Sequence, residues 1–421
     1  MELKPGYKQT EVGVIPLDWE VKRLGDIANI QRGASPRPID SPVWFDHSST
    51  VGWVRIADIT NAGRFLNETT QRLSSLGVKE SRPVAAGSLI MSICATVGRP
   101  IITNIDVCIH DGFVVFGKLE TDQMFIYYVL KWIEPDWSKH GQTGSQMNLN
   151  TGLINDTKIK LPCLSEQTVI ATVLSDMDAL LDSLDRLIAK KRDIKQAAMV
   201  ELLTGKTRLP GFEGEWERVE LKKHISFLRN GVNSRAELTV DDPVKYLHYG
   251  DIHSQSKVLF APDNLPSIPL EKARNLDFLQ DGDLVFADAS EDLQGVSKSV
   301  EIFNVGQNTV VAGLHTIAVR FDKSKMGDGF KAYLQFIPEF NSVLRRLASG
   351  TKVYATNKSH IEGIVMRLPS LSEQTAIAKV LSDMDAEIEA LEVRRTKTQN
   401  IKQGMMQELL TGKTRLIAQE G

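Results

Sequence analysis

The sequence predicts an α+β fold, in which two mixed α/β domains are joined by two long helices that form an antiparallel coiled coil. Three observations lead to this prediction. One long segment occurs twice, its apolar residues recur at helical spacing, and the stretches between the copies carry short strand-like runs. The fold should therefore show a pseudo-two-fold internal repeat.

The duplicated segments, 161–209 and 368–416, align without a gap, and 31 of their 49 positions are identical. Self-similarity of this extent indicates an internal repeat. The chain should therefore run as variable domain, helical spacer, variable domain and helical spacer. The expected boundaries are residues 1–160, 161–210, 211–367 and 368–421.

Each copy is expected to form one long helix. Ser165 suits the N-cap after the helix-breaking Pro162, and Gly205 and Gly412 suit the C-terminal ends. The first helix, over 165–203, would be about 58 Å long at about 1.5 Å per residue. A lone amphipathic helix of that length needs a partner for its apolar stripe, and the other copy is the nearest one.

The apolar positions of both copies follow a heptad-like spacing and should form the seam between the helices. They are Ile170, Leu174, Met177, Leu181, Leu184, Ile188, Ile194 and Ala198 in the first copy, and Ile377, Leu381, Met384, Ile388, Leu391, Ile401 and Met405 in the second. Because Arg394 and Arg395 replace Leu187 and Ile188, perfect two-fold packing is not expected there.

The variable domains differ in sequence but share a skeleton. Trp19 corresponds to Trp216, and Asp58 corresponds to Asp251, in the same order along each half. Short apolar runs bounded by Gly, Pro and Asn indicate strands. The expected strands are 52–59, 88–93, 111–116, 245–252, 283–288 and 315–321, and the expected helices are 122–133 and 329–337.

Composition is that of an ordinary globular protein, with 42% hydrophobic and 24% charged residues. No apolar run is long enough to span a membrane, and the N-terminus lacks the pattern of a signal peptide. Three cysteines fit a reducing compartment without a disulfide framework. We therefore expect a cytoplasmic location.

The net charge of −3 argues against a polycation. Residues 20–160 contain 15 Lys and Arg against 14 Asp and Glu, and residues 212–367 contain 19 against 21. A protein that wrapped DNA alone would usually show a basic excess. If DNA is bound, the positive charge must be focused in loops or supplied by a partner.

Several patterns suggest catalysis or cofactor binding, but ordinary structural roles fit them better. Thr204-Gly205-Lys206-Thr207 resembles the end of a phosphate-binding loop, but it lacks the earlier glycine and follows a helix, which favours a helix C-cap. The histidines lack metal-ligand spacing; His110 near Cys108 has no second pair. Loops typical of a methyltransferase or a metal-dependent nuclease are also absent from the sequence. No catalytic or metal-binding residues are expected.

Polar loops at matching positions in both halves are the candidates for DNA contact. Arginine can bond a guanine edge bidentately, and Gln or Asn can do so for adenine, while the alternative is that such loops are ordinary solvated turns. The candidates are Arg32, Ser35, Arg37, Arg55, Gln142, Thr143, Ser145, Gln146 and Asn148 in the first half, and Asn233, Ser234, Arg235, His248, Thr351, Lys352 and Tyr354 in the second.

The chain resembles the specificity subunits of type I restriction–modification systems over essentially its full length. The resemblance rests on the opening at 7–20, on Leu-Ser-Glu-Gln at 164–167 and 371–374, and on the segment 202–212. It implies two target recognition domains that each read half of a split DNA site, and two helices that set the gap between the half-sites. It also implies docking of two modification subunits, which methylate adenine, and of restriction subunits, which carry the translocase and nuclease. S-adenosylmethionine, ATP and Mg²⁺ would belong to those partners, and this chain would bind no cofactor.

The physics of split-site reading agrees with this resemblance. Half-sites read from one face of DNA lie about one turn apart, roughly 34–36 Å between centres, and a rigid helical spacer suits that task. Two other hypotheses stay open. The near-neutral charge is compatible with a protein–protein scaffold that has no direct DNA readout, and a fused nuclease or methyltransferase would make the chain an enzyme.

Overall fold

The computed structural model describes residues 5–140, 149–255, 257–290, 295–348 and 354–417. They fold into two compact units. Unit 1 comprises residues 1–184 and 394–421, and unit 2 comprises residues 185–393. Each unit thus takes one variable domain together with part of both helical repeats. Among the described residues, no helix combines the length and the apolar character that crossing a membrane would require.

Unit 1 is built on a five-stranded sheet with the order β4-β12-β9-β10-β6, beside a four-stranded sheet with the order β7-β5-β11-β8. The first sheet consists of β4 (Asn29–Arg32), β12 (Phe113–Gly117), β9 (Leu89–Ser92), β10 (Pro100–Thr103) and β6 (Phe65–Leu66), and the second of β7 (Gln71–Arg72), β5 (Gly52–Val54), β11 (Val107–Ile109) and β8 (Arg82–Val84). Two antiparallel pairs complete the strands: β1 (Tyr7–Thr10) with β2 (Gly13–Pro16), and β3 (Glu20–Arg23) with β13 (Lys158–Leu161). The helices are α1 (Leu24–Ile27), α2 (Ile56–Asn61), α3 (Ser75–Lys79), α4 (Gln123–His140), α5 (Thr151–Asp156) and the 3-10 turn η1 (Pro42–Trp44).

Unit 2 repeats this arrangement. Its five-stranded sheet has the order β15-β23-β19-β21-β17, and a three-stranded sheet has the order β18-β16-β22. The strands are β15 (Ile225–Phe227), β23 (Thr316–Phe321), β19 (Leu284–Ala287), β21 (Ser299–Ile302), β17 (Leu259–Phe260), β18 (Ser267–Ile268), β16 (Val244–Leu247) and β22 (Thr309–Ala312), with the pairs β14 (Glu217–Glu220) with β25 (Val365–Leu368) and β20 (Ala289–Ser290) with β24 (Tyr354–Ala355). The helices are α7 (Tyr249–Ser254), α8 (Leu270–Ala273), α9 (Pro338–Leu347), α10 (Lys358–Glu362) and the 3-10 helices η2 (Leu221–Lys223), η3 (Arg235–Glu237) and η4 (Lys331–Phe336). Because the larger sheets share one strand order, the duplication extends to the divergent domains.

Two of the expected strands are only half correct. The run 52–59 divides into β5 and α2, and the run 245–252 divides into β16 and α7. In each case an aspartate at the third helical position, Asp58 or Asp251, accepts a bond from the backbone N–H of the N-cap residue. That capping interaction begins a helix where the apolar pattern alone suggested a continuing strand.

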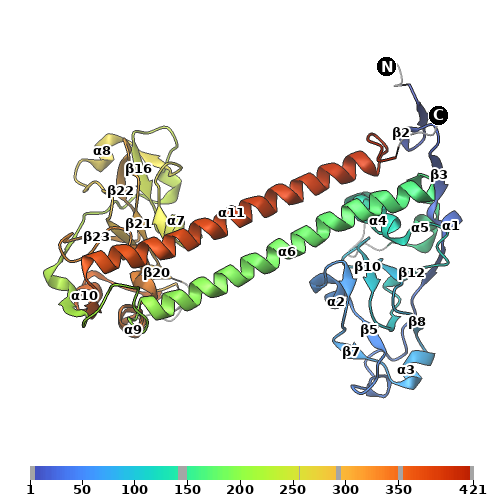
Figure 1. Cartoon of the computed structure of the whole chain (residues 1–421), viewed down its shortest axis with the longest axis horizontal. Helices are drawn as coiled ribbons and strands as arrows, with labels where there is room; N and C mark the ends of the chain where they lie inside the picture. Colours follow the sequence, from blue (N-terminus) through green and yellow to red (C-terminus); the bar gives the residue numbers. More distant parts are fainter. Residues whose placement is uncertain (1–4, 141–148, 256, 291–294, 349–353, 418–421) are drawn as a thin grey trace. The chain divides into compact units, whose positions relative to one another are not determined.

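The two repeats form the long helices α6 (Leu164–Leu202) and α11 (Leu371–Leu409), drawn in green and red in Figure 1. In unit 1, Lys402 pairs with Asp178, and Arg415 pairs with Glu166. In unit 2, Lys195 pairs with Asp385, and Arg208 pairs with Glu373. In each unit, a residue later in the first repeat pairs with a residue earlier in the second repeat. The two repeats therefore run antiparallel.

The core of each unit includes both long helices. In unit 1, Ile170 and Leu174 of α6 join Met406 and Leu409 of α11 in one buried cluster with the sheet and α4. In unit 2, Met199 and Leu202 of α6 join Ile377 and Leu381 of α11 in the equivalent cluster. The predicted α+β fold with paired antiparallel helices is therefore confirmed.

The seam departs from the expected heptad positions in its second part. Leu174, Leu181, Leu184, Leu381 and Ile388 are buried, and Met177, Met384 and Leu391 are half-buried. Ile194 and Ile401, in contrast, are 44% and 46% exposed. The next residues, Lys195 and Lys402, turn inward to their aspartate partners, and Met199 and Met406 are buried in place of Ala198 and Met405. Ala198 and Met405 are half-buried and pack against these clusters. The prediction was wrong for Ile194 and Ile401, because apolar spacing takes no account of ion pairs.

Candidate nucleic-acid interface

In unit 1, a cluster of arginines gathers around Asp111, in the turn between β11 and β12. The Nε of Arg32 donates to the Asp111 carbonyl at 2.7 Å. The Ser35 hydroxyl and the Arg37 guanidinium donate to the two carboxylate oxygens at 2.7 and 3.3 Å. Three predicted residues from one loop therefore share an acceptor, which we call the Asp111 cluster.

Neighbouring segments complete the Asp111 cluster. Arg82, which loop composition did not identify, donates to the Arg32 carbonyl at 2.5 Å. Arg55 is the N-cap residue of α2, is half-buried, and lies close enough to His110 to lower its pKa. A close backbone approach requires Gly33, because a Cβ there would lie 2.1 Å from the His110 carbonyl oxygen. Several segments thus bring four arginines together.

The electrostatics of this cluster hold it in one state near neutral pH. Burial lowers the pKa of His110, and its Nδ1 accepts from the Gly112 N–H at 2.8 Å, so the imidazole is neutral. Burial raises the pKa of Asp111, but the Ser35 hydroxyl and the nearby His110 and Arg37 outweigh that effect, so the pKa lies below its ordinary value. Arg37 is therefore balanced by an ionised carboxylate while its side chain stays 70% exposed.

In unit 2, the predicted loop residues lie before and within η3. Ser234 is its N-cap residue, and both Ser234 and Asn233 donate to Glu237. The exposed Arg235 donates to Asp251 at 2.8 Å. The loop is thus built by local caps, and Arg235 is its exposed cation.

His248 is the weakest of the predicted contacts. It is 6% exposed, and its Nδ1 accepts from the Gly250 N–H, so it acts as the N-cap residue of α7. It occupies the place that Arg55 has in unit 1. Beside it, the ring of Tyr249 is tilted against His248, with centroids 4.5 Å apart, and meets His315 edge-on at 5.4 Å. The exposed His315 is a better candidate; it lies in the turn between β22 and β23, the counterpart of the Asp111 turn, and loop composition did not identify it.

Tyr354 begins β24, where it pairs with Ser290 of β20, and it is half-buried. The remaining predicted contacts lie outside the described residues. They are Gln142, Thr143, Ser145, Gln146 and Asn148 in the first half, and Thr351 and Lys352 in the second.

Charged clamps hold the long helices in each unit. Glu166 of α6 is fully buried and accepts from Trp19 Nε1 at 3.0 Å and from Arg415 at 2.6 and 2.8 Å. In unit 2, Glu373 accepts from Arg208 at 2.5 and 2.6 Å. The end of each repeat therefore clamps the beginning of the other. These residues are identical in the two copies, and that identity is the signal by which the clamps could have been found in the sequence.

A second matched contact lies further along each helix. In unit 1, Asp178 accepts from Lys402 at 2.5 Å and from the Tyr128 hydroxyl at 2.7 Å. In unit 2, Asp385 accepts from Lys195 and from the Tyr333 hydroxyl. In both units, a tyrosine of the variable domain is therefore fastened to a polar pair in the helix seam.

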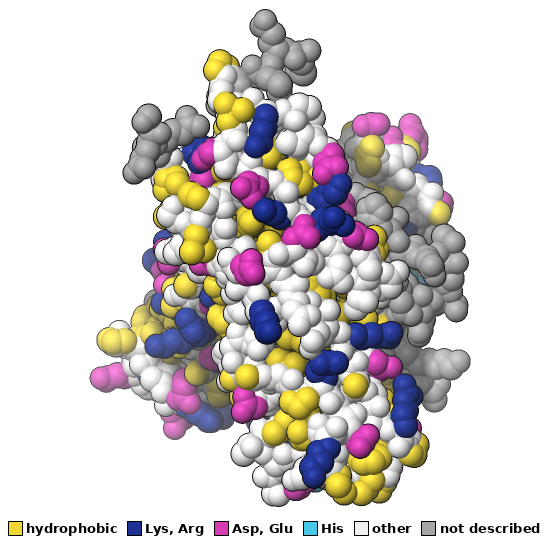
Figure 2. Space-filling model, turned by 90° about the vertical axis from the view of Figure 1, so that its right-hand side faces the viewer, with side chains coloured by type: hydrophobic (Ala, Val, Ile, Leu, Met, Phe, Trp, Pro, Cys, Tyr) yellow, Lys and Arg dark blue, Asp and Glu magenta, His cyan; other side chains and the backbone are white. Residues whose placement is uncertain are grey.

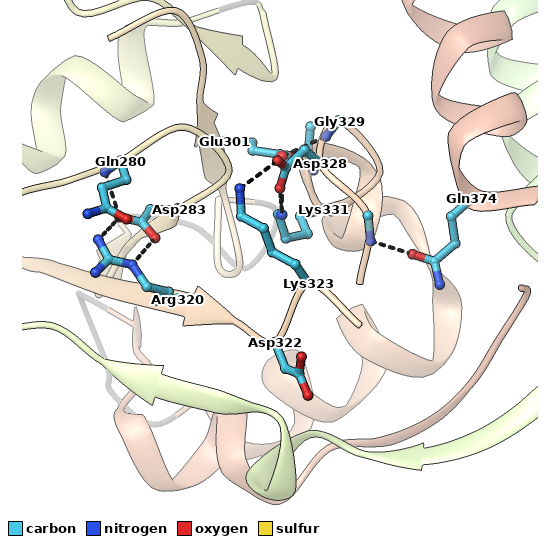
Figure 3. A network of polar contacts seen from close by, with 12 residues as sticks. Gln280, Asp283, Glu301, Arg320, Asp322, Lys323, Asp328, Gly329, Lys331 and Gln374 are labelled. Carbon is cyan, nitrogen blue, oxygen red and sulfur yellow. Dashed lines mark hydrogen bonds and ion pairs between the residues drawn. The ribbon is translucent and has the colours of Figure 1, made fainter. Parts of the chain in front are cut away.

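Figure 3 shows how the variable domain of unit 2 meets α11. The amide oxygen of Gln374, labelled in Figure 3, accepts from the Gly327 N–H at 2.8 Å. The amide nitrogen of Gln374 donates to the Lys325 carbonyl at 2.9 Å. Nearby, the buried Glu301 accepts from the Gly329 N–H at 2.6 Å. The bonds of Gln374 fix the loop before η4 against the first turn of α11, and the bond of Glu301 holds the same loop to β21.

The charge on the face of the molecule in Figure 2 is mixed. Lysines and arginines are interspersed there with aspartates and glutamates, without a continuous basic patch. Among the described residues, no group of three or more His, Cys, Asp or Glu side chains could hold a metal ion.

The chain is similar to known proteins both in part and over nearly its full length. Residues 16–191 match the family model described as "Type I restriction modification DNA specificity domain". The type I restriction enzyme MjaVIII specificity subunit of Methanocaldococcus jannaschii is 25% identical and aligns over 96% of this chain and 94% of its own length. The chain carries a type I restriction–modification DNA specificity domain at residues 16–191, and over nearly its full length it is similar to a type I restriction enzyme specificity subunit.

Solved structures from type I restriction–modification systems share the fold of this chain. The type I restriction–modification S subunit from M. genitalium has a TM-score of 0.57 at 12% identity, covering 97% of this chain and 98% of that one. A chain from a structure of complex assembly in the type I system also has a TM-score of 0.57, at 14% identity, covering 95% and 99%. The similarity spans both units, so unit 2 is part of the specificity-subunit fold although the family model matches only the first half.

Proposed function

We propose that this chain is a specificity subunit that binds DNA directly and that each unit reads one half of a split site. The observation that carries the proposal is the recurrence of one arrangement in two units. In unit 2 the exposed Arg235 pairs with Asp251 of α7, the short helix that follows β16. In unit 1 the exposed Arg37 pairs with Asp111, next to His110, which lies near Arg55, the N-cap residue of the short helix that follows β5. The scaffold is repeated, while the loop residues differ, as two readers of different sequences require.

The chemistry of the Asp111 cluster supports the reading of bases more than sequence-independent attraction to the DNA phosphates. Arg37 is exposed and held by a single long contact of 3.3 Å, which a guanine edge or a phosphate could replace. The mixed surface charge implies weak binding to random DNA, because non-specific affinity comes from phosphate neutralisation. Sequence discrimination would then depend on a few arginines in each unit.

The paired helices would set the distance between the half-sites and dock the partner subunits. We propose two modification subunits and a set of restriction subunits as partners, with S-adenosylmethionine, ATP and Mg²⁺ bound by them and not by this chain. The chain itself would be non-catalytic. It would be located in the cytoplasm, together with its DNA and its partner subunits. The continuity of α6 and α11 over 39 residues each supports the ruler.

The first test of DNA reading compares two arginines of unit 1. Arg37 and Arg23 are both exposed, and both contact an aspartate at 3.3 Å, but Arg23 lies in β3, outside the Asp111 cluster. Cells that carry the partner modification subunit with each variant would be analysed by sequencing of methylated adenines. Arg37→Ala should weaken discrimination by about 10- to 100-fold at one half-site only, and Arg23→Ala should leave the motif intact.

The second test changes the ruler. Removing seven residues from each helix, 185–191 and 389–395, keeps the seam in phase because seven residues are one heptad. Each helix would shorten by about 10 Å, equivalent to about three base pairs. The methylated motif should keep both half-sites with a shorter gap. An unchanged gap would refute the ruler.

The competing hypothesis is a protein–protein scaffold without direct DNA readout. It predicts that split-site methylation persists when this chain is deleted from cells that keep the modification subunit. It also predicts that exchanging residues 20–155 for another variable domain leaves the methylated motif unchanged. A change in one half-site only would favour DNA reading, and a change in both would contradict modular reading.

A further inference from the structure

Unit 2 contains a cavity, lined by cationic, polar and apolar side chains, that the DNA-reading proposal does not use. It lies where the end of α7, the first residues of β21, η4 and α9 meet, and its volume is about 340 Å³. That volume is near the lower end of the range of roughly 300–1,000 Å³ for small-molecule sites. All of its lining residues belong to unit 2.

Three cations line this cavity: Lys257, Lys298 and Arg345. Lys298 donates to the His253 carbonyl at 2.6 Å, so its position is fixed. Lys257 pairs with Glu389 at 2.6 Å, but both side chains are more than half exposed, so this pair is weak. Arg345 is exposed on α9 and has no ion-pair partner among the described residues. The lining therefore carries excess positive charge.

Two buried polar atoms at the cavity have no partner among the described residues. The Ser299 side chain is 2% exposed, and its Oγ forms no hydrogen bond. The amide nitrogen of Asn341 donates to the Gln335 carbonyl at 2.8 Å, which fixes the orientation of the amide and leaves Oδ1 without a donor. Folded proteins leave few such atoms, and a bound water, ion or ligand can supply the missing bonds.

We propose that the cavity binds a phosphorylated nucleoside. The phosphate would lie against Lys298 and Arg345, which provide charge-assisted donors. Phe336, which lines the cavity and is 40% exposed, offers an aromatic face for the base. A sugar hydroxyl or a base amino group would donate to Asn341 Oδ1, and Ser299 Oγ would bond the same ligand.

The matched position in unit 1 lacks this chemistry. Leu89 faces Ile102 across β9 and β10, as Leu284 faces Glu301 across β19 and β21. By this register, Pro100 occupies the place of Ser299, and a proline has no hydroxyl to offer. The cavity lining is therefore a feature of unit 2 and not of the shared scaffold. The inference goes beyond DNA reading and does not depend on it.

The test uses the purified full chain and isothermal titration calorimetry. The probes are AMP, GMP, adenosine, inorganic phosphate, and a short DNA duplex, which separates a free nucleotide from a nucleotide of DNA. The variants are Ser299→Ala and Arg345→Ala, with Arg346→Ala as the control, because Arg346 is the adjacent exposed arginine and does not line the cavity. Thermal unfolding checks that each variant is folded.

AMP or GMP should bind more tightly than adenosine or phosphate. Arg345→Ala should weaken that binding by about tenfold, and Arg346→Ala by less than about twofold. Ser299→Ala should weaken binding without lowering the melting temperature, since its hydroxyl has no partner in the fold. If only duplex binding responds to Arg345→Ala, the occupant is a nucleotide of DNA. The proposal is overturned if no probe responds to Ser299→Ala and Arg345→Ala, or if phosphate or adenosine alone binds as tightly as the nucleotides.

Discussion

Replacing Arg415 with methionine should destabilise unit 1 far more than the loss of an ordinary surface ion pair. Arg415 bonds Glu166 twice, at 2.6 and 2.8 Å, and Asp18 twice, at 2.9 and 2.7 Å. Glu166 is fully buried, whereas the Asp18 side chain is 49% exposed. After the substitution, water can solvate Asp18, but Glu166 keeps only the Trp19 indole N–H at 3.0 Å.

The expected magnitude follows from the burial of Glu166. Breaking a buried ion pair from one side costs about 3–5 kcal/mol, because it leaves an uncompensated charge. Adding Glu166→Gln to Arg415→Met removes that charge, so the double variant should be more stable than Arg415→Met by about 1–3 kcal/mol. An exposed pair such as Arg23 with Asp156 contributes only about 0–1 kcal/mol, so Arg23→Met is the matched control.

Hydrogen exchange followed by mass spectrometry is the suitable assay, because a chain with two units need not unfold in one step. Peptides from 164–184 and 394–409 report on unit 1, and peptides from 371–393 report on unit 2. Protection should fall in the first set and persist in the second. The reasoning is refuted if Arg415→Met costs less than about 1 kcal/mol, or if the effects of the two substitutions simply add.

Three further predictions concern single side chains. Leu174→Ala should lower the free energy of unfolding by about 2–5 kcal/mol, because Leu174 is fully buried. Ile194→Gln should change it by less than about 0.5 kcal/mol, because Ile194 is exposed. Equal effects in thermal unfolding would contradict the seam described above. Burial raises the pKa of Glu301 from its ordinary 4.5 to about 7, so the stability from this group is complete below pH 4.5 and is lost as the pH rises through 7. Unit 2 should therefore lose about 2 kcal/mol between pH 5 and 8 relative to Glu301→Gln, and parallel pH profiles would disprove it. Asp111→Asn removes the carboxylate beside Arg37. Binding to random duplex DNA should therefore tighten a few-fold while discrimination at the half-site falls, as measured by competition binding. Unchanged binding would show that Asp111 is not part of the interface.

Much of the fold could be predicted because the sequence contains an internal duplication. Duplication identified the long helices, their approximate ends and the antiparallel pairing without any knowledge of contacts. The errors came where polar residues determine the structure. Ile194 and Ile401 fit an apolar heptad, but they are exposed, and the half-buried Lys195 and Lys402 next to them form ion pairs across the seam.

The candidate interface was less predictable from the sequence. Loop composition identified Arg32, Ser35 and Arg37, but their common acceptor, Asp111, is more than 70 residues away in the chain. Only the strand pairing brings β4 and β12 together. His248 illustrates the opposite error, because a polar residue at a matching position can be a buried helix cap instead of a contact.

The division into units has a consequence for synthesis on the ribosome. Unit 2 is complete once residue 393 has emerged, whereas unit 1, whose variable domain is made first, needs residues 394–421. Until then, the nascent first domain carries an open apolar stripe at Leu174 and the carboxylate of Glu166 without Arg415. The domain translated first is therefore the last to mature, and a ribosome that stalls before residue 394 should release a chain whose first half is prone to aggregation and whose second half is folded.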